Sequence, residues 1–338
     1  MTDTPADGPA GADSANADPA SNDPEVVVLR QNIHGIPPKR YVEALRERLP
    51  DMTVAYAATP EQERDLLPTA RIVAGFSLDE GDLERAENLE LFACSFAGVD
   101  HLPLEAFREH GVAVTNASGV HGPNIGEYAL GAILTFTRDF LESRRRQERR
   151  EWRSHRTREL AGNTVVVVGM GPIGEAVVQR LDGFDVRTVG VRYSPEKGGP
   201  TDEVYGYEDI AEAAAEASYV VLACPLTDAT EELIDGEVFA TLPSDAVLVN
   251  VARGGVVDTE ALVYALRWNS IRGAALDVTD PEPLPEDHEL WTFENVLITP
   301  HNAGHTPEYF ARLADIVAEA VETADESGEW DGLPNQVV

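Results

Sequence analysis

Two kinds of hydrophobic pattern alternate along the chain from residue 25 onward. Short apolar runs, rich in β-branched residues, are typical of buried strands: "EVVVLR" (25–30), "TVAYAA" (53–58), "ARIVAG" (70–75), "LELFAC" (89–94) and "VAVTNA" (112–117). Segments with helical spacing lie between some of them, such as "PPKRYVEALRERL" (37–49), which opens on proline, and residues 103–109. This alternation predicts an α/β fold in which helices cover both faces of a parallel sheet.

A second series of the same kind begins near residue 163. Its strands are expected at "NTVVVVGMG" (163–171), "DVRTVGVR" (185–192), "ASYVVLAC" (217–224), "DAVLVNVARG" (245–254), "GAALDV" (273–278) and "ENVLIT" (294–299). Between the two series, residues 124–152 read as one long helix, and residues 305–326 read as a final helix. By contrast, residues 1–24 carry no large apolar side chain after Met1, so we expect a disordered tail there.

The charge of the chain is unusual. Its 338 residues include 60 acidic and 26 basic side chains, a formal net charge of -34, and the only lysines are Lys39 and Lys197. Such a charge repels itself in the compact state unless salt screens it, which leads to the hypothesis of an extreme halophile. The same acidity argues against nucleic acid and anionic membrane surfaces as partners. Eight arginines between Arg144 and Arg158 are therefore interpreted as a solvated or subunit-facing surface.

Several absences favour a cytoplasmic protein. No apolar run approaches the roughly 20 residues of a membrane-spanning helix, and the N-terminus lacks the apolar core of a signal peptide. Cys94 and Cys224 are the only cysteines, which predicts free thiols in a reducing compartment. Cys224 has no evident base beside it in sequence, so a nucleophilic role is not expected.

The stretch "NTVVVVGMGPIGEAVVQRL" (163–181) places Gly169-x-Gly171-x-x-Gly174 between a strand and a helix. In a dinucleotide-binding unit, Gly169 would allow the tight turn, Gly171 the close approach of a pyrophosphate, and Gly174 close packing of helix on strand. The pyrophosphate would lie at the helix N-terminus, where free N–H groups favour anions.

The next strand ends in an arginine where such units usually carry an acid for the ribose 2′-hydroxyl. The residues there are Arg192, Tyr193 and Ser194, and Lys197 follows shortly. Arginine pairs bidentately with phosphate, and a serine hydroxyl is a second donor, so the sequence predicts a 2′-phosphate site and hence NADP(H). The alternative is that Arg192 stacks on the adenine and that NAD(H) is accepted too.

Taken together, several motifs resemble those of the D-isomer-specific 2-hydroxyacid dehydrogenase family over about residues 25–338. They are "FAGVDHL", "GMGPIG", "ACPLTDAT", "LVNVARGGVVD", "ALDVTDPEPLP" and "LITPHNAGHT". The resemblance implies two domains of doubly wound parallel sheet, Rossmann-like and flavodoxin-like, with an active-site cleft between them. The substrate domain would be residues 25–117 plus 301–338, and the dinucleotide domain residues 118–300. It also implies a homodimer, to which the helix from Gly126 would contribute.

Reduction of a 2-keto acid needs a cation for the substrate, an acid for the forming alkoxide, and a carboxylate that favours the protonated acid. Arg253, Glu282 and His301 each follow a predicted strand and match the family's catalytic arginine, glutamate and histidine. Asp280 and Glu286 are alternatives to Glu282. The alternative interpretations are a surface ion pair for Arg253, a solvated loop acid for Glu282 and a helix N-cap for His301. His301 and His305 are spaced four apart, yet no third ligand converges in sequence, so no metal site is expected.

The resemblance also assigns contacts to other residues. The backbone N–H groups of Ala97, Gly98 and Val99 would hold the substrate carboxylate, with Gly75 in the same pocket and with Arg253 and His301 also touching the substrate. The remaining cofactor contacts would be Pro172 and Ile173 in the glycine loop, Cys224, Pro225 and Thr230 near the adenosine, and Val251, Ala252 and Asp277 near the nicotinamide. Asp277 would accept a hydrogen bond from the carboxamide or serve as a structural cap.

These residues predict an enzyme that reduces 2-keto acids to D-2-hydroxy acids, reversibly, with NADP(H) preferred and NAD(H) tolerated. L-specific malate and lactate dehydrogenases are disfavoured because their glycine loop opens near the N-terminus. A formate dehydrogenase would carry glutamine at position 282, and a phosphoglycerate dehydrogenase would be expected to have more basic residues near the substrate loop and a regulatory domain. The alternative from another class is a dinucleotide-sensing scaffold or corepressor of the same fold.

Overall fold

The computed structural model describes residues 24–33 and 35–338, so the tail predicted to be disordered lies outside the described residues except for Pro24. The chain forms two compact units. The first ends at Ala117 and takes in Phe310–Val338 as well, and the second is Ser118–Tyr309. The second crossing falls later than the predicted residue 300, because hydrogen bonds from Asn302 and Ala303 to Asp277 hold the intervening loop to the second unit.

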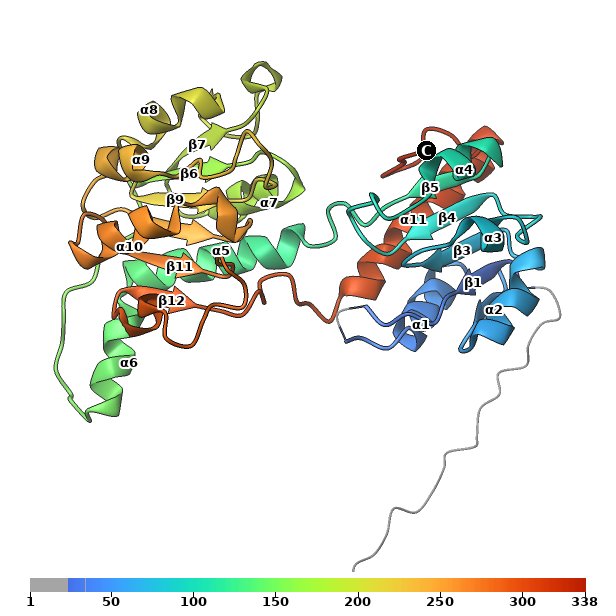
Figure 1. Cartoon of the computed structure of the whole chain (residues 1–338), viewed down its shortest axis with the longest axis horizontal. Coiled ribbons are helices and arrows are strands. Elements are labelled where there is room, and N and C mark those ends of the chain that lie inside the picture. Colours follow the sequence, from blue (N-terminus) through green and yellow to red (C-terminus); the bar gives the residue numbers. More distant parts are fainter. Residues whose placement is uncertain (1–23, 34) are drawn as a thin grey trace, which may run out of the picture. The chain divides into compact units, whose positions relative to one another are not determined.

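The first unit is built on a five-stranded parallel sheet in the order β2-β1-β3-β4-β5. Its strands are β1 Val26–Val28, β2 Val54–Tyr56, β3 Ile72–Gly75, β4 Leu91–Cys94 and β5 Ala113–Thr115 (Figure 1). This order is that of flavodoxin-like sheets. β1, β3, β4 and β5 are buried throughout, which explains their continuous apolar runs.

Helices cover both faces of this sheet. They are α1 Lys39–Arg48, α2 Pro60–Leu66, α3 Glu80–Leu83, α4 Leu104–Glu109 and α11 Tyr309–Ser327. One face packs Val73 and Phe92 against Leu83 of α3 and Phe107 of α4. The strand residues that alternate with these point to the opposite face. Tyr41 of α1 and Phe310 of α11 stack there, with ring centroids 5.0 Å apart.

The second unit contains a seven-stranded parallel sheet in the order β12-β11-β10-β9-β6-β7-β8. The strands are β6 Thr164–Val168, β7 Arg187–Val191, β8 Glu203–Tyr205, β9 Tyr219–Leu222, β10 Val247–Asn250, β11 Gly273–Leu276 and β12 Val296–Ile298. The order reverses between β6 and β9, as in Rossmann sheets, and ligands bind at such reversals. The predicted fold class, two doubly wound parallel-sheet domains, is confirmed. β8 was not predicted because this short edge strand is not fully buried and has no apolar run.

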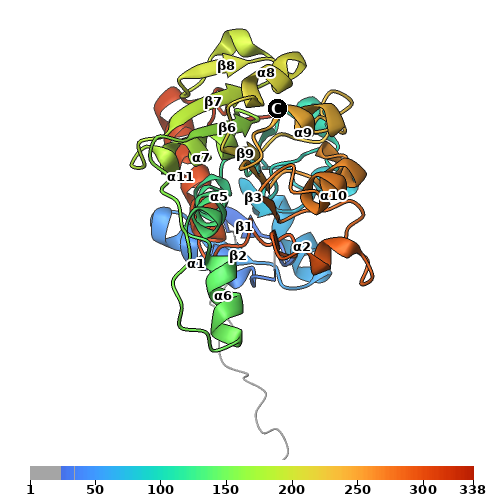
Figure 2. The ribbon, with the colours of Figure 1, turned by 90° about the vertical axis from the view of Figure 1, so that its left-hand side faces the viewer.

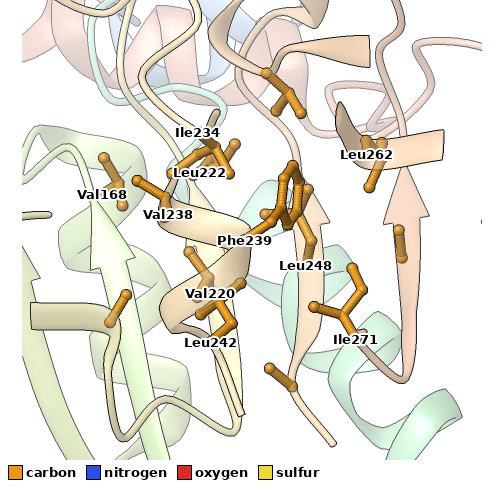
Figure 3. Close-up of a cluster of buried hydrophobic side chains, with 14 of the residues drawn as sticks. Val168, Val220, Leu222, Ile234, Val238, Phe239, Leu242, Leu248, Leu262 and Ile271 are labelled. Atoms are coloured by element: carbon orange, nitrogen blue, oxygen red, sulfur yellow. The ribbon is translucent and has the colours of Figure 1, made fainter. Parts of the chain in front are cut away.

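The helices of the second unit also form two layers. They are α5 Gly122–Thr137, α6 Phe140–Glu148, α7 Pro172–Leu181, α8 Ile210–Ala214, α9 Gly236–Thr241 and α10 Thr259–Arg267. Figure 2 shows α5 and α7 on one side of β6 and β9, with α9 and α10 on the other. Figure 3 shows the second layer's core, in which Val238 and Phe239 of α9 face Val220 and Leu248. None of the helices in the described ranges is long and apolar enough to cross a membrane.

The single helix predicted over residues 124–152 is wrong. α5 ends at Thr137 and α6 begins at Phe140, because Asp139 takes a left-handed backbone conformation with φ of 52°. Aspartate is one of the few residues that visit this region, and only as single residues. After α6 the chain leaves the helix, and Trp152 is fully exposed. Glu142 pairs with the neighbouring Arg145 at 3.1 Å and Arg146 at 2.5 Å, so part of the arginine charge is neutralised locally.

Candidate functional site

The glycine loop follows β6 and leads into α7. Gly169 has φ of +97°, and a Cβ there would lie 2.6 Å from the backbone nitrogen of Cys224. A Cβ on Gly174 would lie 1.9 Å from the carbonyl oxygen of Gly169. Both positions therefore exclude any side chain, one for the turn and one for the packing of α7 on β6, as predicted from the sequence.

Gly171 differs from the other two glycines. A Cβ there would meet no protein atom within 4 Å, and its φ of -99° is open to any residue. Gly171 is the N-cap of α7, and no side chain caps the helix. The fold itself does not require glycine at this position, but a pyrophosphate approaching the free N–H groups of α7 does. The loop therefore fits a dinucleotide.

This contrast gives a matched pair of substitutions. Gly171→Ala is expected to leave the thermal unfolding midpoint nearly unchanged while weakening dinucleotide binding about tenfold or more, because the methyl group would occupy the space that a pyrophosphate needs. Gly174→Ala is expected to destabilise the fold by about 1–3 kcal/mol or more, because the helix must move off the strand. Calorimetry and NADPH titration of both variants measure the two effects. Equal binding by Gly171→Ala and the wild type would contradict this use of the loop.

A cavity of about 760 Å³ opens at the glycine loop. It lies at the carboxyl ends of β6, β7, β9 and β10, and its wall includes eleven residues predicted to bind the cofactor: Gly169, Gly171, Pro172, Ile173, Arg192, Tyr193, Ser194, Cys224, Pro225, Val251 and Ala252. The charged residues of this wall are Arg192, Lys197 and Arg253. In a chain with 60 acidic residues, a wall whose charges are all positive indicates an anionic ligand.

Arg192 stands directly after β7, and its Nη1 donates to the carbonyl oxygen of Gly198 at 2.7 Å. This bond holds the guanidinium, and Ser194 and Lys197 line the same cavity. Tyr193 is exposed and forms, with Tyr207 and Pro225, the wall of an adjoining hollow of about 520 Å³. Asp228 lines that hollow and not the cavity of the three cations. The rings of Tyr193 and Tyr207 make this hollow suited to an aromatic base.

Three predicted cofactor residues, Gly174, Thr230 and Asp277, are absent from the cavity wall. Gly174 acts through packing, as described above. Thr230 is buried, and its hydroxyl donates to the carbonyl oxygen of Pro225 at 2.6 Å and accepts from the backbone N–H of Thr227 at 2.8 Å. Thr230 therefore shapes this loop, and its direct contact with the cofactor stays a prediction.

Cys224 lines the cavity but is buried. Burial raises the pKa of its thiol to about 11. The thiol therefore stays protonated near neutral pH, and the expectation that Cys224 is not a nucleophile agrees with its surroundings.

Arg253, Glu282 and His301 stand in the loops that follow β10, β11 and β12. These three strands are neighbours in the sheet, so their loops emerge at the same edge. His301 Nδ1 lies 2.8 Å from Glu282 Oε1, and both side chains are partly exposed. Asp280 and Glu286, the alternatives to Glu282, form no hydrogen bond or ion pair with the imidazole within the described residues. The geometry selects Glu282 as the partner of the histidine.

Asn250, the last residue of β10, was missed by sequence reasoning. It is buried, its Nδ2 donates to the carbonyl oxygen of Arg253 at 3.0 Å, and its Oδ1 accepts from the N–H of Ala252. Gly254 follows, where a Cβ would lie 2.1 Å from the backbone of Thr279. The turn that carries Arg253 is thus held by its own strand and packed against the loop that leads to Glu282.

The helical metal-site interpretation of His301 and His305 does not describe this loop. His301 has φ of 51° and lies outside any helix. Within residues 24–33 and 35–338 no group of three or more His, Cys, Asp or Glu side chains is arranged to hold a metal ion.

The left-handed backbone conformation of His301 is strained for a residue other than glycine, and such strained residues cluster at functional sites.

The residues predicted to bind the substrate carboxylate lie in the first unit. Ala97 and Gly98 are exposed, and Val99 is partly buried in the loop after β4. Gly75 is buried, and a Cβ there would lie 2.7 Å from Leu29. An aromatic cluster beside this loop was not predicted from the sequence: Phe76 stacks on His101 with ring centroids 4.3 Å apart.

Comparison with known proteins agrees with this site. A model of the family described as "D-isomer specific 2-hydroxyacid dehydrogenase, NAD binding domain" matches residues 130–303. The chain belongs to the D-isomer-specific 2-hydroxyacid dehydrogenase family. Membership confirms the resemblance seen in the sequence motifs, and the matched segment contains the glycine loop, Arg192 and all three predicted catalytic residues.

Individual members of the family are moderately similar to this chain. A glyoxylate reductase of Thermofilum pendens is 36% identical over 250 residues, 71% of this chain and 73% of that protein. A D-3-phosphoglycerate dehydrogenase of Methanocaldococcus jannaschii is 33% identical over 282 residues, 82% of this chain, but the match spans only 54% of that protein. A D-isomer specific 2-hydroxyacid dehydrogenase from Xanthobacter autotrophicus, solved with NADPH and MES, is 29% identical, with a TM-score of 0.72 over 93% of this chain and 98% of its own.

Proposed function

We propose that this family member reduces 2-keto acids to D-2-hydroxy acids, reversibly, with NADPH preferred and NADH tolerated. The observation that carries the proposal is the His301–Glu282 pair, which stands with Arg253 at the ends of three adjacent strands. Arg253 also lines the cavity of the glycine loop, so one of the three proposed catalytic residues borders the proposed dinucleotide site.

Each of the three side chains has a task in this proposal. The Glu282 carboxylate can only accept, so the proton between it and His301 belongs to Nδ1, and Nε2 is left to give a proton to the forming alkoxide. Glu282 favours the imidazolium through its opposite charge and fixes the ring. The planar cation of Arg253 holds the substrate carboxylate and polarises the keto group. When bound, the nicotinamide supplies the hydride that adds to the keto carbon.

The proposal also assigns substrate binding to residues of the first unit. The N–H groups of Ala97, Gly98 and Val99 bind the substrate carboxylate in the exposed loop after β4, and Gly75 borders the same site. The predicted role of Asp277 toward the carboxamide remains part of the proposal as well. Its carboxylate is buried and already accepts hydrogen bonds from the loop of His301.

The preference for NADPH rests on the positive wall of the cavity. Arg192 and Lys197 offer charge and Ser194 a hydroxyl at the end of β7, where an NAD-specific unit would carry an acid. A 2′-phosphate brings about two negative charges that this wall neutralises, whereas a ribose hydroxyl gains little from it.

The test is a set of initial rates in molar KCl with NADPH and with NADH. The panel contains glyoxylate, pyruvate, hydroxypyruvate, 2-ketoisocaproate, phenylpyruvate and 3-phosphohydroxypyruvate. We expect turnover of at least one unphosphorylated acid and a kcat/KM for NADPH about tenfold or more above that for NADH. Turnover of the phosphorylated acid alone would assign a phosphoglycerate-type activity, and cofactor binding without any turnover would favour a sensing scaffold.

We also propose a homodimer in the cytoplasm. Phe140, the first residue of α6, is largely exposed, and Trp152, four residues after the end of α6, is fully exposed. Exposed aromatics of this size are enriched where another surface covers them. Light scattering is expected to give twice the chain mass of 36.6 kDa, and Trp152→Ala is expected to shift part of the protein to monomer. A monomeric wild type would contradict the assignment.

The acidic surface predicts that stability rises with salt. Between about 0.1 M and about 3 M KCl the screening length falls from about 10 Å to below 3 Å, so repulsion among the carboxylates weakens. We expect the thermal unfolding midpoint to rise steeply over this range, with activity following it. A midpoint that is flat or falls with KCl would contradict the halophile hypothesis.

A further inference from the structure

The helix α5 contacts the loop of His301 at two points, and no sequence motif predicts either contact. The hydroxyl of Tyr128 lies 2.6 Å from Thr299 Oγ1, and Asn124 Nδ2 donates to the carbonyl oxygen of Ala303 at 2.8 Å. Asn124 and Tyr128 are four residues apart and share one face of the helix. The two contacts fall on either side of His301, so α5 holds both ends of the short segment that carries the imidazole.

The direction of the hydrogen bonds in this network follows from its chemistry. Thr299 Oγ1 donates its single proton to Asp277 Oδ1 at 2.5 Å, so the proton between Tyr128 and Thr299 must come from the tyrosine. Burial raises the pKa of Tyr128, and the phenol therefore stays protonated and remains a donor. The result is a chain from Tyr128 through Thr299 to a buried carboxylate, in which each bond polarises the next.

Asp277 connects this chain to the histidine. Its Oδ1 also accepts from the N–H of Asn302 at 2.8 Å, its Oδ2 from the N–H of Ala303 at 2.9 Å, and its backbone carbonyl from the N–H of His301 at 2.8 Å. The left-handed backbone of His301, with φ of 51°, persists because bonds on both sides hold it.

We propose that Tyr128 is a positioning residue for His301, acting through Thr299 and Asp277 to hold the imidazole where it meets Glu282. The inference rests on the proposed function only in assigning proton transfer to His301. Tyr128 does not line the cavity wall, so we expect its removal to change the placement of the imidazole and to leave cofactor binding nearly unchanged.

The second unit provides a matched control. Tyr219 on β9 lies with its hydroxyl 2.6 Å from Thr137 Oγ1, and Thr137 donates its own proton to the carbonyl oxygen of Ile133 at 2.8 Å. The pair has the same chemistry, distance and direction of donation as Tyr128 and Thr299, but it stands at the far end of α5. Tyr128→Phe and Tyr219→Phe each remove one phenol hydroxyl with no change of shape.

The kinetic experiment compares these two variants in molar KCl, with the best substrate of the wild type. Tyr128→Phe is expected to lower kcat about three- to tenfold, the rate equivalent of one hydrogen bond, with KM and NADPH affinity within about twofold of wild type. Tyr219→Phe is expected to keep kcat within about twofold. Thr299→Ser is expected to keep the wild-type kcat, and Thr299→Val is expected to lower kcat more than Tyr128→Phe does. Equal kcat losses in the two tyrosine variants, or none in Tyr128→Phe, would overturn the proposal.

Hydrogen exchange tests the same network without any turnover. The amides of His301, Asn302 and Ala303 are expected to exchange faster in Tyr128→Phe than in wild type, and at the wild-type rate in Tyr219→Phe. Unchanged exchange in Tyr128→Phe would refute the positioning role. If the wild type reduces no keto acid, the proposed function fails, but this exchange difference still decides whether Tyr128 holds the loop.

Discussion

Replacing His301 by glutamine is expected to lower kcat for keto acid reduction about 10²–10⁴-fold, the range that a positioned general acid contributes. Glutamine has a similar reach and still donates a hydrogen bond to Glu282, but its amide cannot release a proton to the alkoxide. NADPH affinity is expected to stay within about twofold, because His301 does not line the dinucleotide cavity. Stopped-flow reduction and fluorescence titration of the same preparation measure both quantities.

The acids of the neighbouring loop provide the control for this result. Glu282→Gln should lower kcat, because the neutral amide no longer favours the imidazolium. Asp280→Asn removes an acid two residues away that, within the described residues, forms no hydrogen bond or ion pair with His301. We expect Asp280→Asn to resemble the wild type. A His301→Gln variant that turns over at the wild-type rate would remove His301 from the mechanism.

Replacing Arg192 by aspartate is expected to weaken NADPH binding about 10²-fold or more while changing NADH binding by less than about threefold. The substitution removes a bidentate donor from the 2′-phosphate and puts a repelling charge in its place, and each charge-assisted hydrogen bond contributes about 1.5–3 kcal/mol. The quantity to measure is the dissociation constant of each cofactor for wild type and variant, from titrations in one KCl concentration.

Arg187 at the other end of β7 gives the matched control. Its guanidinium is exposed and pairs with Glu203 at 2.6 Å, away from the cavity wall. Arg187→Asp makes the same change of charge, so it should affect both cofactors equally and weakly. Equal losses of NADPH and NADH affinity in Arg192→Asp would refute the phosphate role and support stacking of Arg192 on the adenine.

Much of the fold was predictable because its signals are local. A buried parallel strand shows as a continuous apolar run, and each residue predicted to be catalytic follows such a run. Because these strands are neighbours in the sheet, Arg253, Glu282 and His301 stand at one edge. The three glycines could likewise be given separate tasks from the strand–loop–helix context. In the structure, surrounding protein atoms leave no room for a side chain at Gly169 and Gly174. At Gly171 no protein atom would meet an added Cβ within 4 Å.

What the sequence could not predict depends on contacts between distant residues. Tyr128 and Thr299 are 171 positions apart, and Phe76 and His101 are 25 positions apart, so no periodicity connects them. The helix break at Asp139 was not predicted, because the helical pattern of the sequence continues across it and only one residue there adopts the left-handed conformation. The motif around Thr230 likewise does not reveal that its hydroxyl donates to the carbonyl oxygen of Pro225.

The most direct test of hydride transfer to a 2-keto acid uses NADPH that carries two deuterium atoms at C4 of its nicotinamide. The wild type is incubated in molar KCl with the keto acid that it prefers, and the product is separated on a chiral column and analysed by mass spectrometry. We expect a D-2-hydroxy acid with one deuterium at C2, formed in step with NADPH oxidation. An L-configured product, or oxidation of NADPH with no deuterium in the hydroxy acid, would contradict it.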